Sequence, residues 1–594
     1  MTGLAGHIPM KPKIPSRRVR VGLISLGCAK NLVDAEIMLG SLMKGGVEIT
    51  NDPGQADALI VNTCSFIDAA QEESIDTILE STELRQAQRP GQALIVSGCL
   101  PQRFRDDLPK LLPEVDAFLG IDQVAEVGRI VTEAIANRRA KLEAQRAEGR
   151  ANAPAVGKGK GKAKGPAAAV KGEIRRLDRA RLQGGGHTHD HAHPDPGPVH
   201  TQAHVHLAPA AAVATLAAAA APPAGPIVEV NVRPAFIPDF GTPRFRLTPK
   251  HFAYVKIAEG CNHPCSFCII PRMRGSHRSR SQSDIVSEAK LLLKDGVKEL
   301  NLISQDSTYY GLDLRANHSR NIASPEKFRA AAGALPADAT TLCTLVRALN
   351  GLKGDFWIRL LYTHPAHWTD ELIRTLAECP KVARYVDMPL QHIHANMLER
   401  MRRETSREYI EDLIERIRAG IPGIALRTTF IVGFPGETES SFESLLEFIR
   451  TTRFERLGVF TYSKEDGTRA ASMVGHVSES VKKQRRERAM AEQHRIAQEI
   501  AAAQVGRTLR VLVEKEAGAR ELKEARASSW EHGLIRELDS GAFSLRGRYL
   551  VARGEADAPD IDGRVYIRGD LAPGKFAKVR IIGHTDYDLL AEPA

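Results

Sequence analysis

The chain has 594 residues, of which 43% are hydrophobic, enough for about three to five domains with ordinary cores. Its formal net charge of +10 suggests a nucleic-acid partner, but much of the excess lies at 141–182, where twelve Lys and Arg stand against four acids. The N-terminal residues MTGLAGHIPMKPKIPSRR lack the apolar centre of a secretory signal and no stretch resembles a membrane span, which predicts a cytoplasmic protein without a membrane partner.

Residues 18–140 are expected to form an N-terminal βαβ parallel-sheet domain. Three apolar runs predict strands, and each ends in a cysteine: VRVGLISLGC at Cys28, ADALIVNTC at Cys64 and ALIVSGC at Cys99. Helix-like stretches separate them, as in parallel βαβ units. Because the carboxyl ends of parallel strands meet at one sheet edge, the three thiols are expected to lie close together. Alternatively, they are ordinary buried cysteines at strand ends.

The composition changes sharply over 141–245, from GKGKGKAKG through a tract with seven histidines to AAAVATLAAAAAPPAGP. Few aromatic and β-branched residues leave this stretch unable to offset its ordering entropy. We expect a disordered insert or linker. The histidines leave metal storage or delivery open as an alternative.

Six strand candidates alternate with helices over 246–503, which predicts an open six-stranded partial TIM barrel. Active sites of such barrels lie beyond the carboxyl ends of the strands. Those positions carry Cys261, Gln305, Asp306, His364, Gln391 and Glu437. Residues 504–592 contain short alternating runs such as TLRVLVEKE and FAKVRIIGH between Gly/Pro turns, which predicts a small β-barrel with a binding role.

The loop EGCNHPCSFCII places Cys261, Cys265 and Cys268 within eight residues. In a reducing compartment clustered thiols bind metal more often than they form disulfides. Zinc sites and cubane iron–sulfur clusters usually take four protein ligands, so one ligand is missing here. His263 leaves a zinc knuckle open as an alternative. Cys343 and Cys379 stand apart and are expected to be small buried hydrophobes.

The spacing of these three cysteines, after the first barrel strand, resembles the cluster loop of the radical S-adenosylmethionine (SAM) enzymes. The resemblance implies that the iron without a protein ligand takes SAM. An electron from the cluster then cleaves SAM and releases a radical that abstracts hydrogen from unactivated carbon. In that family the missing ligand is what allows the cofactor to bind.

SLGCAKN, NTCSFI and SGC, followed by EGCNHPCSFCIIPRMRG, IVGFPGET and YSKEDGT, are similar to the methylthiotransferases over about 20–137 and 250–590. The resemblance implies an auxiliary cluster on Cys28, Cys64 and Cys99, a radical SAM domain and a C-terminal TRAM β-barrel. It further implies two [4Fe-4S] clusters, with SAM as both radical source and methyl donor.

RMRG, WIRLLYTHP and YVDMPLQH resemble the methylthiotransferase branch that modifies the β-carbon of an aspartate in small-subunit ribosomal protein S-twelve. The resemblance implies this protein as partner, on or near the small ribosomal subunit, with an electron donor and a sulfur donor. The alternative branch modifies a transfer-RNA adenosine, and TRAM modules are usually regarded as RNA binders. Acids in RGEADAPDID and HTDYDLLAEP lead us to expect a C-terminal barrel suited to a basic protein.

Further residues are assigned by position. Gln305, Asp306 and Arg427 are expected near SAM because polar groups at strand ends can reach it, with hydrogen bonding at the barrel rim as the alternative. Gly433, Pro435 and Gly436 either let the backbone approach the cofactor or form a simple turn. Residues that can contact substrate or move protons, or be satisfied by hydrogen bonds alone, are His364, His392 and His394.

A different class of function is also open. The histidine tract and the six clustered cysteines could belong to a metal-storage or scaffold protein, which would hold zinc and no reactive cluster. Iron and sulfide analysis distinguishes this alternative from the enzyme.

Overall fold

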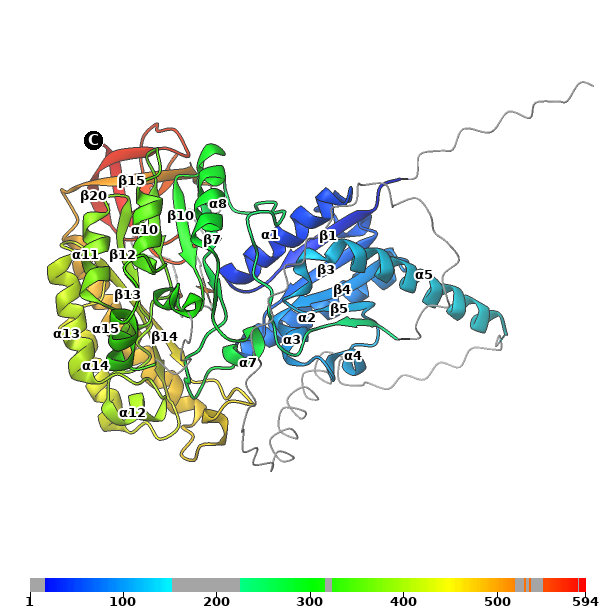
Figure 1. Cartoon of the computed structure of the whole chain (residues 1–594), viewed down its shortest axis with the longest axis horizontal. Helices are drawn as coiled ribbons and strands as arrows, with labels where there is room; N and C mark the ends of the chain where they lie inside the picture. The colour runs from blue at the N-terminus through cyan, green and yellow to red at the C-terminus, as the bar shows by residue number, and fades with distance from the viewer. Residues whose placement is uncertain are drawn as a thin grey trace, which may run out of the picture.

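The structure is a computed structural model that describes residues 17–151, 225–315, 323–518, 548–585 and 587–594, with two short strands at 528–529 and 534–535. In Figure 1 an N-terminal sheet domain in blue and cyan lies beside a larger domain in green and yellow, and the C-terminal strands in red pack on the latter. Every helix in the described part of the chain falls short of the length and apolarity that a membrane crossing requires.

The N-terminal domain is an all-parallel six-stranded sheet, which confirms the predicted fold. Its central strands are buried at every residue, which explains why ALIVNT and ALIVSG are continuous apolar runs. The strand order is β2 (Glu48–Ile49), β1 (Arg20–Ser25), β3 (Ala58–Thr63), β4 (Ala93–Gly98), β5 (Ala117–Leu119) and β6 (Ile227–Glu229). The helices are α1 (Ala29–Lys44), α2 (Asp68–Gln88), α3 (Cys99–Arg103), α4 (Leu108–Leu111) and α5 (Val127–Ala151).

The bounds predicted for the insert, 141–245, are wrong at both ends. Helix α5 continues to Ala151, and the chain from 225 onward returns to the N-terminal domain, where β6 pairs with β5. The backbone N–H of Phe245 donates to the carbonyl oxygen of Glu36 at 2.8 Å. A three-residue strand after an Ala/Pro tract is too short for composition to reveal. The intervening basic and histidine-rich sequence lies outside the described residues.

The second domain is a parallel six-stranded sheet that does not close on itself, which confirms the open partial barrel. Its order is β14 (Arg456–Thr461), β13 (Ala425–Val432), β12 (Val382–Asp387), β11 (Trp357–Leu360), β10 (Glu299–Ile303) and β7 (Phe252–Lys256). A short hairpin, β8 (Ala258–Glu259) with β9 (Arg278–Ser279), follows β7. Helices of this domain are α7 (Ile270–Arg274), α8 (Gln282–Lys294), α9 (Pro325–Gly333), α10 (Leu342–Asn350), α11 (Asp370–Glu378), α12 (Ala395–Arg400), α13 (Arg407–Gly420), α14 (Glu439–Thr452) and α15 (Glu479–Ala502).

Side-chain caps define where five helices of this domain begin. The residue before each helix is Ser or Thr, and its hydroxyl accepts a backbone N–H of the first turn. These caps are Ser281 of α8, Thr341 of α10, Thr369 of α11, Ser406 of α13 and Thr438 of α14. The polar first turns therefore fix the helices, while their apolar faces are free to pack on the sheet.

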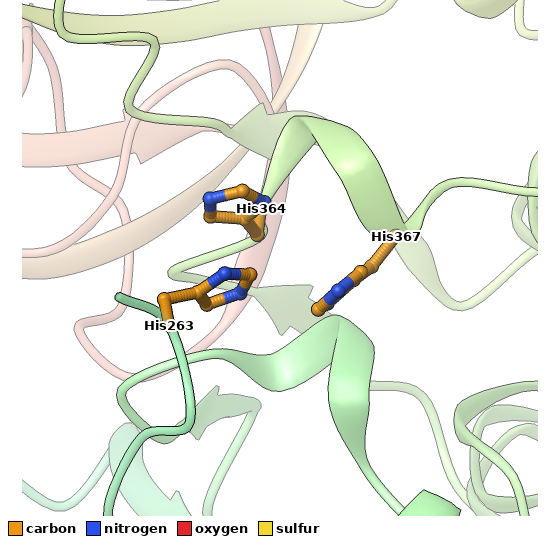
Figure 2. A group of neighbouring side chains, drawn as sticks. All are labelled: His263, His364 and His367. Carbon is orange, nitrogen blue, oxygen red and sulfur yellow. The ribbon is translucent and has the colours of Figure 1, made fainter. Parts of the chain in front are cut away.

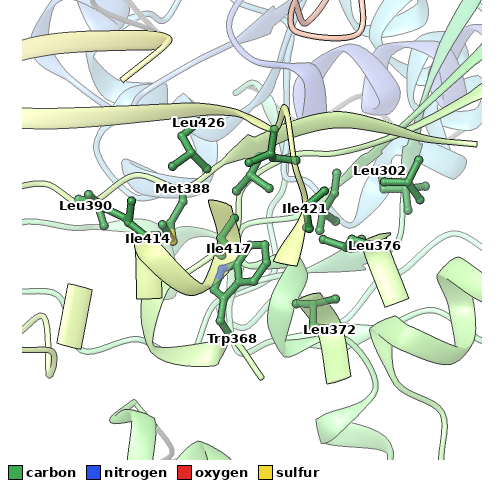
Figure 3. Close-up of a cluster of buried hydrophobic side chains, with 14 of the residues drawn as sticks. Leu302, Trp368, Leu372, Leu376, Met388, Leu390, Ile414, Ile417, Ile421 and Leu426 are labelled. Atoms are coloured by element: carbon green, nitrogen blue, oxygen red, sulfur yellow. The ribbon is translucent and has the colours of Figure 1, made fainter. Parts of the chain in front are cut away.

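The apolar core of the barrel lies between the strands and these outer helices (Figure 3). Cys343 and Cys379 are 6% and 4% exposed within it, as expected of small buried hydrophobes. Residues labelled in Figure 3 include Leu302 of β10, Trp368, Met388, Leu426 of β13, and Ile414, Ile417 and Ile421 at the end of α13.

A second apolar cluster joins all three domains. It contains Val33 and Ile37 of α1, Phe252 and Tyr254 of β7, and Ala558 of the C-terminal domain, all at most 5% exposed. Edge strand β7 of the barrel is thereby covered by α1 of the N-terminal domain (Figure 1). The N-terminal domain therefore shields the open barrel from solvent along strand β7.

The C-terminal domain is a closed five-stranded barrel, as predicted. The sequence did not reveal two of its strands, LVARG and LLAEP, because each is only five residues long. The barrel order is β15 (Thr508–Glu516), β18 (Leu550–Gly554), β19 (Val565–Ile567), β21 (Leu589–Pro593) and β20 (Phe576–His584).

The expectation that acids of RGEADAPDID face a basic partner is wrong for Asp557 and Asp562, while Asp560 is exposed. The β18–β19 loop that carries them packs against arginines and a tyrosine of the second domain. Arg456 donates through Nε to Asp557 Oδ1 at 3.1 Å, and Tyr385 donates to Asp562 Oδ2 at 2.7 Å. Asp557 and Asp562 are 4% and 5% exposed, so these carboxylates are internal counterions and are closed to a partner.

A buried ion-pair chain continues this contact. Glu299 at the start of β10 accepts from Arg359 and Arg553 at 2.6 Å each, and Arg553 also donates to Glu514 of β15 at 2.6 Å. Burial raises the pKa of Glu514, but the charge of Arg553 and a hydrogen bond with His251 outweigh it and bring this pKa to about 2. Acid is therefore expected to weaken the contact between the domains.

Glu514→Gln is expected to weaken docking of the C-terminal barrel at neutral pH. The folded-state pKa of Glu514 is depressed, so its stabilisation, up to about 3 kcal/mol, is complete above about pH 4.3 and is lost as pH falls towards about 2. Trp357 lies 4.7 Å from the Phe576 ring across this contact and provides a fluorescence signal. Glu516→Gln, which breaks an exposed pair with Arg548, is the control. Equal acid sensitivity of wild type and Glu514→Gln would contradict the assignment.

Candidate functional site

Three cysteines leave the same edge of the N-terminal sheet. Cys28 follows β1 and caps α1, Cys64 follows β3, and Cys99 follows β4 and begins α3. In the register, Ser25 pairs with Asn62 and Asn62 with Ser97, so the three turns start at one level. The structure thus brings these turns together, and we call Cys28, Cys64 and Cys99 the auxiliary triad.

A glycine that allows close packing and two asparagine side chains hold the turns of this triad. Gly27 has φ +88°, and a Cβ there would lie 2.8 Å from Cys64 Cβ, so the Cys28 turn packs directly on Cys64. Asn31 donates to the Thr63 carbonyl at 2.8 Å, and Asn62 donates to the Asn31 carbonyl at 2.8 Å. These buried bonds fix the turns of Cys28 and Cys64 against each other.

The second triad lies in the loop between β8 and α7. Cys268 N–H donates to the Cys265 carbonyl at 3.2 Å, and Cys261 N–H donates to the Gly275 carbonyl at 3.1 Å. Burial, followed by the neighbouring thiols, raises the pKa of Cys261 well above its usual value and that of Cys268 to about 12. Clustered thiols of this kind ionise readily only when a metal centre replaces their protons. We call Cys261, Cys265 and Cys268 the radical triad.

The donor sets fit iron–sulfur clusters better than single zinc ions. Two sulfurs on one tetrahedral zinc lie roughly 3.8 Å apart. In neither triad do the three sulfurs of the described cysteines all lie within 4.8 Å of one another. His263, the candidate fourth zinc ligand, instead bonds Asp306 Oδ2 through Nε2 at 2.8 Å. A cubane iron–sulfur cluster held by three thiolates is consistent with these contacts.

A buried polar network connects the two triads. Glu259, immediately before the radical loop, accepts from Lys256 at 2.7 Å, from Arg274 at 3.0 Å and from Gln305 at 2.5 Å. Lys256 also bonds Asp34 of α1 at 2.5 Å. The coulombic effect of Arg274 and Lys256 overcomes burial and lowers the pKa of Glu259, which therefore stays ionised.

Gln305 and Asp306 lie directly after β10, as predicted, and both have protein partners. Gln305 Nε2 donates to Glu259, while its Oε1 is buried without a hydrogen-bond donor in the described structure. Asp306 accepts from His263 and His367. Burial opposes ionisation of Asp306, but His367 and His263 outweigh it, and its pKa falls well below the usual range.

His263, His364 and His367 form a buried group whose ring nitrogens lie within 4.8 Å of one another (Figure 2). The rings of His263 and His364 stack at 3.6 Å with an interplanar angle of 16°, so their in-plane lone pairs cannot converge on one ion. Burial lowers the pKa of His263 to about 4 and that of His364 well below its usual value. His263 and His364 are therefore neutral, and with His367 they form a hydrogen-bonded wall beside the radical triad.

Arg427 does not lie at the ligand edge. It is near the start of β13, where Nη1 bonds Asp387 at 2.7 Å and Nε lies 3.5 Å from Asp562 of the C-terminal domain. The prediction that it contacts SAM assumed a strand end and placed it at the wrong end. Its charge instead serves the contact between domains.

The glycines of VGFPGE match the turn alternative. Gly433 and Gly436 have φ +73° and +84°, which favours glycine. A Cβ at Gly433 would collide with Lys482, and one at Gly436 would lie 2.9 Å from Arg400. Both glycines are therefore needed for packing against protein side chains.

His392 is held by its surroundings, whereas Nδ1 of His394 is buried without a hydrogen-bond partner in the described structure. His392 Nε2 lies 3.2 Å from Glu437 Oε1, and its Nδ1 accepts two backbone N–H groups, from Ile393 and His394. Burial lowers the pKa of His392, so the ring is neutral. It supports the loop after β13, as the hydrogen-bonding alternative predicted.

Sequence reasoning missed several charged residues at the site. Arg274 donates to Cys99 Sγ at 3.4 Å, and Arg403 lies 3.7 Å from Cys265 Sγ. Lys30 of α1 places its ammonium 2.9 Å from the centroid of the Tyr362 ring, and Tyr362 has φ +60° after β11. The signal available was the charge of Lys256 and Glu259 in an otherwise apolar strand, which requires buried partners.

The fold and the two triads define a radical SAM protein with an additional cysteine domain, and family models agree. The model of an uncharacterized protein family, UPF0004, matches 20–120, the radical SAM superfamily matches 255–449, and the TRAM domain matches 543–593. Among solved structures, the radical SAM methyltransferase TsrM from Kitasatospora setae aligns with a TM-score of 0.42 at 12% identity over 81% of this chain and 89% of that chain.

Curated relatives match nearly the whole chain. Proteins named ribosomal protein uS12 methylthiotransferase RimO are 47% identical in Opitutus terrae, over 97% of both chains, and 42% identical in Akkermansia muciniphila, over 96% of this chain and 99% of that one. The chain therefore belongs to the family of ribosomal protein uS12 methylthiotransferases. It is an enzyme of the radical SAM class, which uses SAM and iron–sulfur chemistry.

Proposed function

We propose that this enzyme adds a methylthio group to the β-carbon of an aspartate in ribosomal protein uS12, the S-twelve protein of the small subunit. The relatives that share nearly its full length carry that substrate in their names. The observation that carries the proposal is the pair of three-thiol sites brought together across the α3–α7 contact, where Ile269 and Met273 pack on Cys99.

The placement of the cysteines supports a separate role for each triad. Cys28, Cys64 and Cys99 would hold an auxiliary [4Fe-4S] cluster, and Cys261, Cys265 and Cys268 the cluster that binds SAM. When bound, these groups supply electron transfer, radical hydrogen abstraction and a methylated sulfur. The chain itself links the two thiol sets through one buried network, which runs from Glu259 beside the radical loop through Arg274 to Cys99.

Residues around the radical triad would orient SAM and exclude water. Gln305 offers a buried carbonyl oxygen without a donor, suited to an N–H of the cofactor. Asp306 holds His263 and His367 against the loop and so supports its shape. Gly433 and Gly436 keep the neighbouring turn compact. Because neither glycine has a side chain, these two residues could contact SAM only through their backbone atoms.

An electron donor and a sulfur donor are required partners, because each transfer consumes reducing equivalents and one sulfur atom. We place the reaction in the cytoplasm, on or near the small ribosomal subunit. The C-terminal barrel is the part of the chain that favours the rival substrate, a transfer-RNA adenosine, since TRAM modules resemble RNA binders.

An anaerobic assay that offers uS12 and a transfer RNA side by side tests the proposal. Mass spectrometry is expected to find one methylthio group on the uS12 aspartate and none on the RNA. A methylthio group on the RNA alone would favour the rival substrate. Bound zinc without iron or sulfide would instead favour a metal-storage protein.

A further inference from the structure

Helix α7 lies between the two triads. It begins two residues after Cys268, and the residues along it contact the auxiliary triad: Ile269, Ile270 and Met273 pack around Cys99. The segment that leaves the radical triad therefore forms part of the wall of the auxiliary triad. A side chain at the end of this helix can act on the auxiliary sulfurs directly.

Arg274 ends α7 and is that side chain. Its Nη2 lies 3.4 Å from Cys99 Sγ and 2.5 Å from Asn31 Oδ1, while Nη1 lies 3.0 Å from both carboxylate oxygens of Glu259. The side chain is 2% exposed, so water does not screen its charge. Guanidinium geometry suits this role, because the planar fork can bond a sulfur, an amide and a carboxylate at once.

The buried charges near Arg274 balance without the thiolates. Lys256 and Arg274 face Asp34 and Glu259, two cations against two anions. A cubane held by three thiolates adds negative charge that increases on reduction. Hydrogen bonds and positive charge at the sulfurs raise the reduction potential of such clusters.

We propose that Arg274 is a positioning residue that orients the Cys99 sulfur and raises the reduction potential of the auxiliary cluster, an inference that rests on the proposed two-cluster function. Arg403, near Cys265, stands in the corresponding place at the radical triad. Each triad thus has its own guanidinium, and the two potentials are set separately.

The test uses the full chain carrying Cys265→Ala, so that the auxiliary cluster is the one to be titrated. Arg274→Gln is added to it, with Arg274→Lys as the variant that keeps the charge. Arg280→Gln is the matched control: Arg280 is also buried, at 4% exposed, and bonds the Lys256 carbonyl and Glu288 without contacting a cysteine in the described structure. Iron content and a redox titration followed by electron paramagnetic resonance are measured anaerobically.

Arg274→Gln is expected to make reduction of the auxiliary cluster about tenfold less favourable, a shift of about 59 mV to lower potential for one electron. Arg274→Lys should shift it less, and Arg280→Gln should leave it unchanged. If Arg274→Gln loses the iron, the potential of Arg274→Lys decides: a shift to lower potential supports the proposal, and an unchanged potential overturns it. An unchanged potential in Arg274→Gln, or equal effects of both substitutions, overturns it. Absence of iron from the parent Cys265→Ala chain overturns the two-cluster function itself.

Discussion

Cys265→Ala is expected to abolish SAM cleavage and to lower the iron content from about eight to about four atoms per chain. Cys265 contributes one of three thiols, and the substitution removes this sulfur but keeps the backbone carbonyl that accepts from Cys268 N–H at 3.2 Å. Two thiolates cannot retain a cubane whose remaining iron must stay available to SAM. The measurements are iron and sulfide analysis and chromatography of the cleavage product under anaerobic conditions.

Cys379→Ala is the matched control for this substitution. Cys379 is 4% exposed, more deeply buried than Cys265, and lies in the barrel core after α11. Its replacement should leave the iron content and SAM cleavage near wild type. If Cys265→Ala retained both full iron and SAM cleavage, the assignment of the radical triad would be wrong.

Cys99→Ala is expected to separate the two half-reactions. Methylthio transfer to uS12 should fall to background, while SAM cleavage stays within about threefold of wild type, because the radical triad is intact. Iron should again fall to about four atoms per chain. Cys99 is the triad member that contacts α7 and Arg274, so its loss removes the auxiliary centre at its contact with the radical domain.

The product analysis decides the meaning of this variant. Mass spectrometry of uS12 and chromatography of the SAM products are run on the same reaction. If Cys99→Ala still transferred a methylthio group, the auxiliary triad would not be the sulfur site. If it lost SAM cleavage as well, with the iron of the radical triad retained, the two centres would be coupled more tightly than their separate thiol sets indicate.

Local patterns predicted most of the fold. Alternating strands and helices identified two parallel sheets, and three cysteines at strand ends identified one edge, because both signals depend on neighbours in sequence. The short strands β6, β18 and β21 were not identified, since three to five residues carry too little periodicity. Pairing with distant strands is what defines them.

Long-range pairing also explains the incorrect site residues. Arg427 looked like a cofactor ligand and Asp562 like a surface acid, yet each is the partner of the other across two domains. Arg274 stood inside the quoted RMRG motif, but its contact with Cys99 joins residues 175 positions apart. A charge in sequence shows that a partner is needed and does not show which one.

The apolar cluster shared by α1, β7 and Ala558 has a practical consequence for expression of the protein. Three family models match separate parts of the chain, and residues of this cluster come from all three parts of the molecule. A fragment cut between any of these parts would expose a surface that the intact chain keeps dry, and would tend to aggregate. Truncation is therefore a poor way to assign activities here, and single substitutions in the intact chain are the proper tools.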